Sequence, residues 1–419
     1  EHYDIELVVA QDCVEPPLAK AYGGARDANW LRANADQVDR VLYQMGNSHF
    51  HAHMLDLLQD VPGVVVLHDF YLSGLMEWME VVFGRPHAWA EALLLSHGYG
   101  AVRDRYLDGE RARKDYPANW HVLQHAQGVI VHSAYSRELA KGWYREHACA
   151  DWRIIPLVRK PPDEVDREAA RKRLGLDVDD FVLCSFGFLT PYKNNHRLLR
   201  AWSGSSLAAD PRCRLIFVGE NNAGDYGAML NDMIKVSGCE QRIDITGFAE
   251  ADDFRQYLAA ADLAVQLRTN SRGETSGAVL DCMGNGVPVI ANANGAMAEF
   301  DPESVWLIPD DFDDEQLVEA LEALRRDAAR RAAMGARGRE IIRERHAPTT
   351  CANAYRDAIE GFHRAAVNGL PALIRSLAPK LQGPPVDDGG LRLLSRTLAQ
   401  DFPLPRPARS IYLDITATC

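Results

Sequence analysis

Short apolar runs rich in β-branched residues alternate with longer helical patterns from one end of this chain to the other. Several runs are apolar at almost every position, as from Gly63 to His68, and lack the alternation of a strand with one face in water. Strands covered by helices on both faces have this pattern, which is typical of parallel sheets. Strands and helices in alternation therefore predict doubly wound α/β layers.

The chain has 419 residues, more than one hydrophobic core usually supports, so we expect two domains. The expected strands of the first are Ile5–Val9, Arg40–Met45, Gly63–His68 and Gly128–Ser133. Those of the second are Phe181–Gly187, Arg214–Gly219, Arg242–Thr246, Leu263–Arg268, Val287–Asn292 and Val305–Pro309. A proline-rich, charged stretch near residues 156–175 marks the boundary. We place one Rossmann-like domain at 1–160 and another at 161–346, followed by a helix at 347–375 that returns to the first domain.

Charge and cysteine content exclude some classes of protein. A net charge of −13 argues against a nucleic-acid partner, because such proteins carry a basic field. The eight cysteines form no C-x-x-C pair and several lie in apolar runs, which favours buried free thiols in a reducing cytoplasm. No apolar stretch reaches the roughly 20 residues of a membrane span.

Ligands of open α/β sheets bind at the carboxyl ends of strands, where helix N-termini offer free N–H groups to phosphates. The segment after the expected strand 263–268 fits that rule best. Arg268 and Arg272 supply positive charge there, and the polar loop leads into a helix. Glu274 and Asp281 could accept hydrogen bonds from hydroxyl groups. The backbone amides expected to face an anion are those of Ser276, Gly277 and Ala278, and Thr275 is a further expected donor-binding residue. Solvated charges beside a capped helix are the plainer alternative.

Three other strand ends carry candidate residues. Gly187 and Lys193 follow the first strand of the second domain, and a lysine there can neutralise a diphosphate. In the first domain, His68 ends a strand and could bond a sugar hydroxyl from the cleft between the domains. Asn47, His51 and Asp69 suggest an acceptor-side loop. A surface lysine and a structural histidine are the competing interpretations.

A chain of motifs resembles the glycosyltransferases of family 4. It comprises Phe217–Glu220, Thr246–Phe248, Tyr257–Val265 and Asp281–Ala291, and the run Gly128–Ser136 in the first half is also similar. The order and spacing match over roughly residues 178–370. The resemblance implies the GT-B architecture, two Rossmann-like domains that face a cleft.

The resemblance also implies roles for individual residues. Lys193 would contact the donor diphosphate. Asp281 takes the place of the second glutamate of the family's E-x7-E motif, which holds the ribose. The nucleobase pocket would be lined by Thr246, Gly247, Phe248 and Ala249. Two positions depart from the pattern: Gly273 stands eight residues before Asp281, with Glu274 one residue later, and Phe188 replaces a phosphate-binding arginine, a charge that Arg268 or Arg272 could supply.

In function, the resemblance implies transfer of a sugar with retained anomeric configuration from a GDP-, UDP- or dTDP-linked donor. The expected acceptor is a glycan or lipid-linked glycan, in the synthesis of O-antigen, capsule, S-layer glycan or another polysaccharide. Lys193, Glu274 and His68 are the expected catalytic residues. We expect a cytoplasmic protein, peripheral at the inner face of the plasma membrane. The alternatives are a sugar epimerase of the same shape and a degenerate sugar-nucleotide-binding or scaffolding module.

No metal or other cofactor is expected, because no convincing D-x-D pair follows a strand. Two acidic pairs, Asp310–Asp311 and Asp313–Asp314, lie in a loop that we expect to be solvated.

The first strand of the first domain has no counterpart near residue 1. Residues 1–4 look like the end of a helix, and Ile5–Val9 corresponds to a second strand, so the central strand is expected to be missing. Residues 376–419 are expected to form a linker and an extra strand, Ile411–Thr416. That strand either begins a further glycosyltransferase domain of a longer chain, which we favour, or fills the vacant slot in this or a neighbouring copy.

Overall fold

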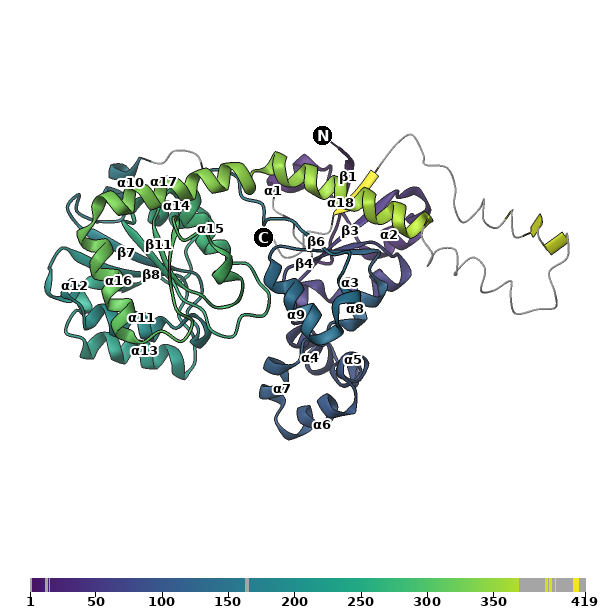
Figure 1. The fold of residues 1–419 in the computed structure, drawn as a ribbon, viewed down its shortest axis with the longest axis horizontal. Helices are drawn as coiled ribbons and strands as arrows, with labels where there is room; N and C mark the ends of the chain where they lie inside the picture. The colour runs from purple at the N-terminus through teal and green to yellow at the C-terminus, as the bar shows by residue number, and fades with distance from the viewer. Residues whose placement is uncertain are drawn as a thin grey trace. The chain divides into compact units, whose positions relative to one another are not determined.

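The computed structural model describes residues 2–11, 14, 16–162, 166–368, 389–390, 392–393, 396 and 410–413. They divide into two compact units. Unit 1 comprises the described residues of 1–132, 137–155 and 352–419, and unit 2 comprises those of 133–136 and 156–351. Each unit has a parallel sheet with helices packed against it (Figure 1). The α/β class predicted from the sequence is therefore confirmed.

Unit 1 carries a seven-stranded parallel sheet among the described residues, in the order β2-β1-β13-β3-β4-β5-β6. Its strands are β1 (Asp4–Val8), β2 (Ala25–Arg26), β3 (Arg40–Met45), β4 (Val64–Leu67), β5 (Gly128–Val131), β6 (Arg153–Ile154) and β13 (Ser410–Leu413). Each strand expected in the first half lies on an observed one. The two-residue strands β2 and β6 were not predicted, because two residues carry no periodicity.

The central slot of this sheet is filled from the far end of the sequence. Strand β13 lies between β1 and β3, with Ile411 in register with Ile5 on one side and with Arg40 on the other. This is the slot-filling arrangement, the one we did not favour from the sequence. Residues 2 and 3 are not helical, in contrast to the expectation for residues 1–4, and β1 begins at Asp4.

The helices that lie wholly or mostly in unit 1 are α1 (Pro16–Ala21), α2 (Ala28–Ala33), α3 (Ala52–Asp60), α4 (Ser73–Val81), α5 (Ala88–His97), α6 (Tyr99–Leu107), α7 (Gly109–Asp115), α8 (Trp120–His125), α9 (Ala134–Tyr144) and α18 (Pro348–Asn368). Helices α2 to α9 contribute buried residues to the core of this unit. Helix α18 packs on the sheet through Phe362, whose ring lies against Gly128 of β5. A largely buried ion pair of 2.9 Å between Glu360 of α18 and Arg40 of β3 adds to this contact.

Unit 2 carries a six-stranded parallel sheet in the order β12-β11-β10-β7-β8-β9. The strands are β7 (Phe181–Phe186), β8 (Cys213–Val218), β9 (Ile243–Ile245), β10 (Leu263–Gln266), β11 (Val289–Asn292) and β12 (Val305–Ile308). All six fall on predicted strands. Strands β7, β8, β10 and β11 are buried along almost their whole length, so their sequences are continuous apolar runs that could be recognised as strands without alternation.

Helices cover both faces of this sheet (Figure 1). One core lies under α11 (Asn195–Ser203), α12 (Ser206–Ala209), α13 (Asp225–Val236) and α16 (Asp314–Arg326). The other lies under α10 (Arg167–Arg173), α14 (Ala251–Ala260), α15 (Gly277–Asn285) and α17 (Ala328–Arg345). Six cysteines among the described residues of the two units are free and buried, as predicted: Cys149, Cys184, Cys213, Cys239, Cys282 and Cys351. Cys13 and Cys419 lie outside the described residues.

Candidate active site

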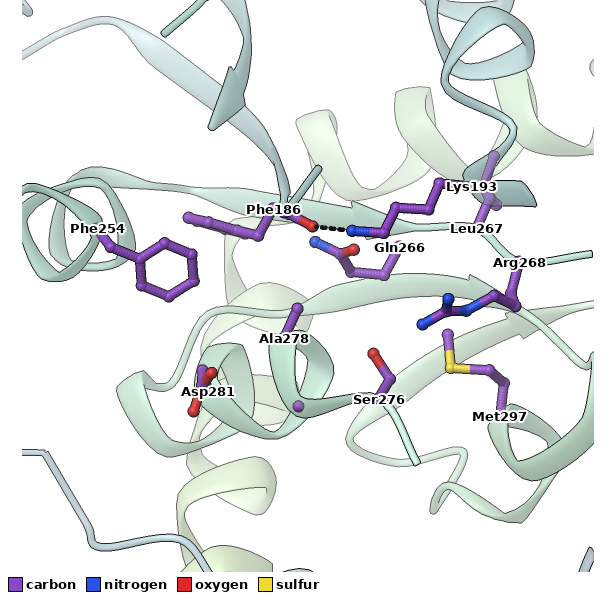
Figure 2. Close-up of a pocket in the computed structure, with 12 residues that line it drawn as sticks. Phe186, Lys193, Phe254, Gln266, Leu267, Arg268, Ser276, Ala278, Asp281 and Met297 are labelled. Carbon is purple, nitrogen blue, oxygen red and sulfur yellow. Dashed lines mark hydrogen bonds between the residues drawn. The ribbon is translucent and has the colours of Figure 1, made fainter. Parts of the chain in front are cut away.

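A pocket of about 260 Å³ opens at the carboxyl ends of β7 and β10, at the edge of unit 2 where the polar loops gather (Figure 2). Seven of the residues predicted from the sequence line it: Gly187, Lys193, Arg268, Ser276, Gly277, Ala278 and Asp281. The remaining lining residues, which sequence reasoning missed, are Phe186, Phe254, Gln266, Leu267 and Met297. The strand-end rule therefore located the pocket, whereas its apolar wall carried no signal in the sequence.

Lys193 ends a short 3-10 turn, Pro191–Lys193, and points into this pocket (Figure 2). Its Nζ donates to the carbonyl oxygen of Phe186 over 3.3 Å. Gly187 has φ +98°, and a Cβ there would lie 2.3 Å from that Nζ, so the ammonium passes directly over the glycine. Burial, and secondarily the charge of Arg268, lowers the pKa of Lys193 to about 8.

Arg268 is the second cation of the pocket, and it begins the loop that leads to α15. Its guanidinium Nη1 lies 3.6 Å from a carboxylate oxygen of Glu274. The other oxygen of Glu274 accepts a 2.6 Å hydrogen bond from the backbone N–H of Arg272. Glu274 and Arg272 do not line the pocket, and the Arg272 guanidinium lies over the ring of Tyr192 instead.

The N-terminus of α15 forms one wall of the pocket. The Ser276 hydroxyl caps the helix by accepting from the N–H of Val279 at 3.4 Å. The nearby Thr275 hydroxyl is buried and has no hydrogen-bond partner among the described residues. Uncommitted N–H groups and the helix dipole make this end favourable for an anion.

Asp281 lies on the second turn of α15 and contacts a residue that we did not predict. The Nε of Arg159 lies 2.9 Å from a carboxylate oxygen of Asp281. Arg159 also lies against Gly277, because a Cβ there would be 2.4 Å from its Nη2. Burial raises the pKa of Asp281, and the guanidinium of Arg159 opposes that rise.

The residues predicted to hold a nucleobase do not line this pocket. The Thr246 hydroxyl accepts from the N–H of Gly219 at 3.1 Å and donates to the carbonyl of Gly247 at 2.8 Å. Phe248 follows on this turn with 74% of its surface exposed, and Ala249 packs against the core beneath α14 and α15. Their predicted role is untested by this geometry.

In unit 1, His68 takes part in a polar network across three strand ends. Its Nε2 lies 2.7 Å from Oε1 of Gln44 at the end of β3, and its Nδ1 lies 3.2 Å from Nε2 of His132 after β5. His132 in turn bonds the carbonyl of Ile155 through Nδ1 at 2.8 Å. Both ring nitrogens of His68 thus have protein partners, so a sugar hydroxyl would have to share or replace one of them.

The predicted acceptor-side residues gather around Gly46, directly after β3. A carboxylate oxygen of Asp69 accepts from the N–H of Asn47 at 2.9 Å, and Oδ1 of Asn47 accepts from the N–H of Leu75 at 2.9 Å. The His51 ring is buried, with Nδ1 3.0 Å from the Ser48 hydroxyl. These contacts order the loop, and the loop's role towards an acceptor stays a prediction.

The acidic loop after β12 exposes Asp310, Asp311 and Asp313 to solvent, as expected, although some of its carboxylates also have protein partners. Asp310 accepts from the side-chain amides of Asn292 at 2.8 Å and Asn294 at 2.9 Å. Asp313 caps α16, and Asp314 pairs with Arg197 and Arg200. The partners of Asp310 and Asp314 lie on other segments of the chain, which a local sequence pattern does not reveal.

Comparison with known proteins shows a family similarity for unit 2. Residues 166–341 match the family described as Glycosyl transferases group 1. Residues 166–341 are therefore similar to the group 1 glycosyltransferases. The matched range begins at the N-cap of α10 and ends within α17, so it covers the sheet of unit 2 and its pocket.

Two relatives are similar to longer or shorter parts of this chain. A GDP-mannose-dependent monoacylated alpha-(1-6)-phosphatidylinositol monomannoside mannosyltransferase of Corynebacterium glutamicum is 34% identical over 187 residues, 43% of this chain and 48% of that protein. A D-inositol 3-phosphate glycosyltransferase of Stackebrandtia nassauensis is 27% identical over 317 residues, 70% of this chain and 68% of that protein. The chain therefore spans just under half the length of the first relative.

Solved structures show the same fold. Anabaena HepE in complex with UDP superposes with a TM-score of 0.60 at 19% identity, covering 82% of this chain and 88% of HepE. WaaG, a glycosyltransferase of lipopolysaccharide biosynthesis, superposes with a TM-score of 0.53 at 16% identity, covering 84% of each chain. The GT-B architecture expected from the sequence is confirmed by these similarities.

Proposed function

We propose that this chain is a retaining glycosyltransferase that moves a sugar from a nucleotide diphosphate sugar to a glycan acceptor. The observation that carries the proposal is the convergence of Lys193, Arg268 and the N-terminus of α15 on one pocket of the group 1 domain. These groups supply two positive charges and a positive dipole end at a strand edge, which suits a diphosphate.

The chemistry of such a transfer needs this charge. As the bond between sugar and diphosphate breaks, negative charge grows on the leaving group and positive charge on the sugar. Preorganised cations and N–H dipoles that face the leaving group lower that barrier. The buried Thr275 hydroxyl, which lacks a protein partner among the described residues, is a further donor for a phosphate oxygen.

Other residues complete the proposed donor site. We propose that Asp281 accepts hydrogen bonds from the ribose hydroxyls; the contact of Arg159 with its carboxylate supports this role. Glu274 is proposed to reach the donor sugar, although Arg268 and the Arg272 N–H engage it in the structure. The turn at Thr246–Ala249 is proposed to bound the nucleobase. His68, Asn47, His51 and Asp69 are proposed to act on the acceptor side.

The donor and acceptor are proposed from relatives. The Corynebacterium enzyme is named for GDP-mannose and a phosphatidylinositol mannoside, and HepE was solved with UDP. We therefore propose a GDP- or UDP-linked hexose, with dTDP sugars also to be tested, and a glycan or lipid-linked glycan acceptor in polysaccharide synthesis. No helix among the described residues is long and apolar enough to cross a membrane. Peripheral attachment to the inner face of the plasma membrane is part of the proposal.

The test is a turnover assay with GDP-, UDP- and dTDP-sugars, each with and without a lipid-linked glycan extract. We expect one donor to release its free nucleoside diphosphate faster when acceptor is present, and the product to keep the donor's anomeric configuration by NMR. Binding of a donor with no acceptor-dependent release would favour the alternative, a degenerate sugar-nucleotide-binding module. Conversion of the sugar nucleotide without transfer would favour an epimerase.

A further inference from the structure

Two buried side-chain amides lie behind the two cations of the pocket, at the ends of neighbouring strands. Gln266 ends β10 and is 5% exposed, and Asn292 ends β11 and is 1% exposed. Burying an amide costs free energy unless its donors and acceptors are satisfied. Both residues stand in otherwise apolar strands, so their polar atoms need a structural account.

The Gln266 side chain continues the pairing between β7 and β10 where the ladder ends (Figure 2). With its amide turned so that the oxygen faces the Phe186 N–H, Oε1 accepts from that N–H at 2.7 Å. In the same orientation Nε2 donates to the Phe186 carbonyl at 3.3 Å. That carbonyl is the one that accepts from Nζ of Lys193. Gln266 therefore holds the acceptor that locates the ammonium.

The Asn292 side chain does the same one strand further along. Its Oδ1 accepts from the N–H of Arg268 at 2.7 Å, and its Nδ2 donates to the carbonyl of Arg268 at 2.7 Å. Nδ2 also donates to Asp310, which in turn accepts from Asn294. Asn294 binds the N–H of Ser271 at 2.9 Å, so the loop after Arg268 is held at two points.

We propose that Gln266 and Asn292 are positioning residues of the donor site, Gln266 acting through Lys193 and Asn292 acting through Arg268. This inference rests on the proposed function. A backbone strand in either place would satisfy the same N–H and C=O groups but would fill the space at the strand ends. A side-chain amide satisfies both groups and leaves the pocket open between the diverging loops.

The test is a pair of double-mutant cycles, with the dissociation constants of UDP and GDP measured by calorimetry. The variants are Gln266→Met and Asn292→Leu, which keep side-chain size and remove the amide, each alone and combined with Lys193→Met or Arg268→Met. Asn231→Leu is the matched control, because Asn231 is an exposed residue of α13 away from the pocket. If either apolar variant does not fold, Gln266→Asn and Asn292→Ser replace it in the same cycle.

We expect each single variant to weaken binding of the nucleoside diphosphate by about tenfold, with no change for Asn231→Leu. The loss from Gln266→Met should vanish in the Lys193→Met background and persist in the Arg268→Met background, and Asn292→Leu should show the reverse. The positioning inference is overturned, with the proposed function left standing, if the losses of affinity add fully in both the Lys193→Met and the Arg268→Met backgrounds. It is also overturned if Gln266→Met and Asn292→Leu bind nucleotide like the wild type. A wild type that binds neither nucleotide overturns the proposed function as well.

Discussion

At the residue scale, the proposed contact between the Lys193 ammonium and the diphosphate can be tested directly by substitution. It is buried beside a second cation and contacts only a carbonyl oxygen in the described hydrogen bonds of its side chain. If it faces the departing diphosphate, its contribution grows in the transition state. Lys193→Ala should therefore lower kcat by roughly 10²-fold or more. A variant with unchanged kcat/KM in steady-state assays would remove Lys193 from the diphosphate site.

The pH dependence follows from the same residue. Its pKa is lowered to about 8, so the ammonium is charged below that pH and neutral above it. The attraction for a diphosphate is thus lost as pH rises through about 8. We expect kcat/KM, which reports groups of the free enzyme, to fall on the alkaline side with that midpoint. Arginine keeps its charge at alkaline pH, so in Lys193→Arg the fall of kcat/KM should no longer occur near pH 8. If the fall stays near pH 8 in this variant, another group causes it.

Asp281 should behave differently from Lys193. A ribose contact is equally strong in the ground state and the transition state, so Asp281→Ala should raise KM for the donor and leave kcat within about twofold. Arg159 holds the carboxylate, and Arg159→Ala should therefore raise the same KM, with Arg159→Lys closer to wild type. Initial-rate kinetics over a donor series give both parameters. A fall in kcat without a change in KM would contradict the ribose assignment.

At the element scale, the strands of both sheets other than β2 and β6 could be predicted from the sequence because each is a local apolar run. The ends of β7 and β10 and the start of α15 could be predicted too, and they brought seven of the expected residues to one pocket. The hydrogen bonds made by the side chains of Gln266, Asn292 and Asp310 could not be predicted, because each depends on which strands become neighbours. A polar residue closing an apolar run, as Gln266 does, is the one local signal that could have revealed part of this network.

The packing of α18 on unit 1 gives an element-scale prediction. A Cβ on Gly128 would lie 2.1–2.4 Å from ring atoms of Phe362, so Gly128→Ala must displace the ring or the helix. We expect it to lower the free energy of unfolding of unit 1 by about 1–3 kcal/mol. Gly142→Ala on α9 is the control, since a Cβ there meets nothing within 4 Å. Equal stability of both variants in denaturant titrations would show that α18 does not pack there in solution.

At the scale of the whole molecule, the two parallel sheets and their helices follow from the alternation in the sequence. The alternation does not reveal which segment of the chain supplies the central strand of unit 1. An apolar run such as residues 411–416 is compatible with any parallel sheet, and nothing local tells which slot it enters. The structure places β13 between β1 and β3, where it pairs backbone groups on both neighbours that a vacant slot would leave unpaired.

The central claim is that the pocket at the carboxyl ends of β7 and β10 binds the diphosphate of a nucleotide-sugar donor. A calorimetric titration of the wild type and Lys193→Ala with UDP, GDP and dTDP tests it most directly. We predict that one nucleoside diphosphate binds the wild type and that its affinity falls at least tenfold in the variant, while the matching nucleoside binds both equally. Equal affinity of the diphosphate for both proteins, or no binding of any of the three to the wild type, would contradict the claim.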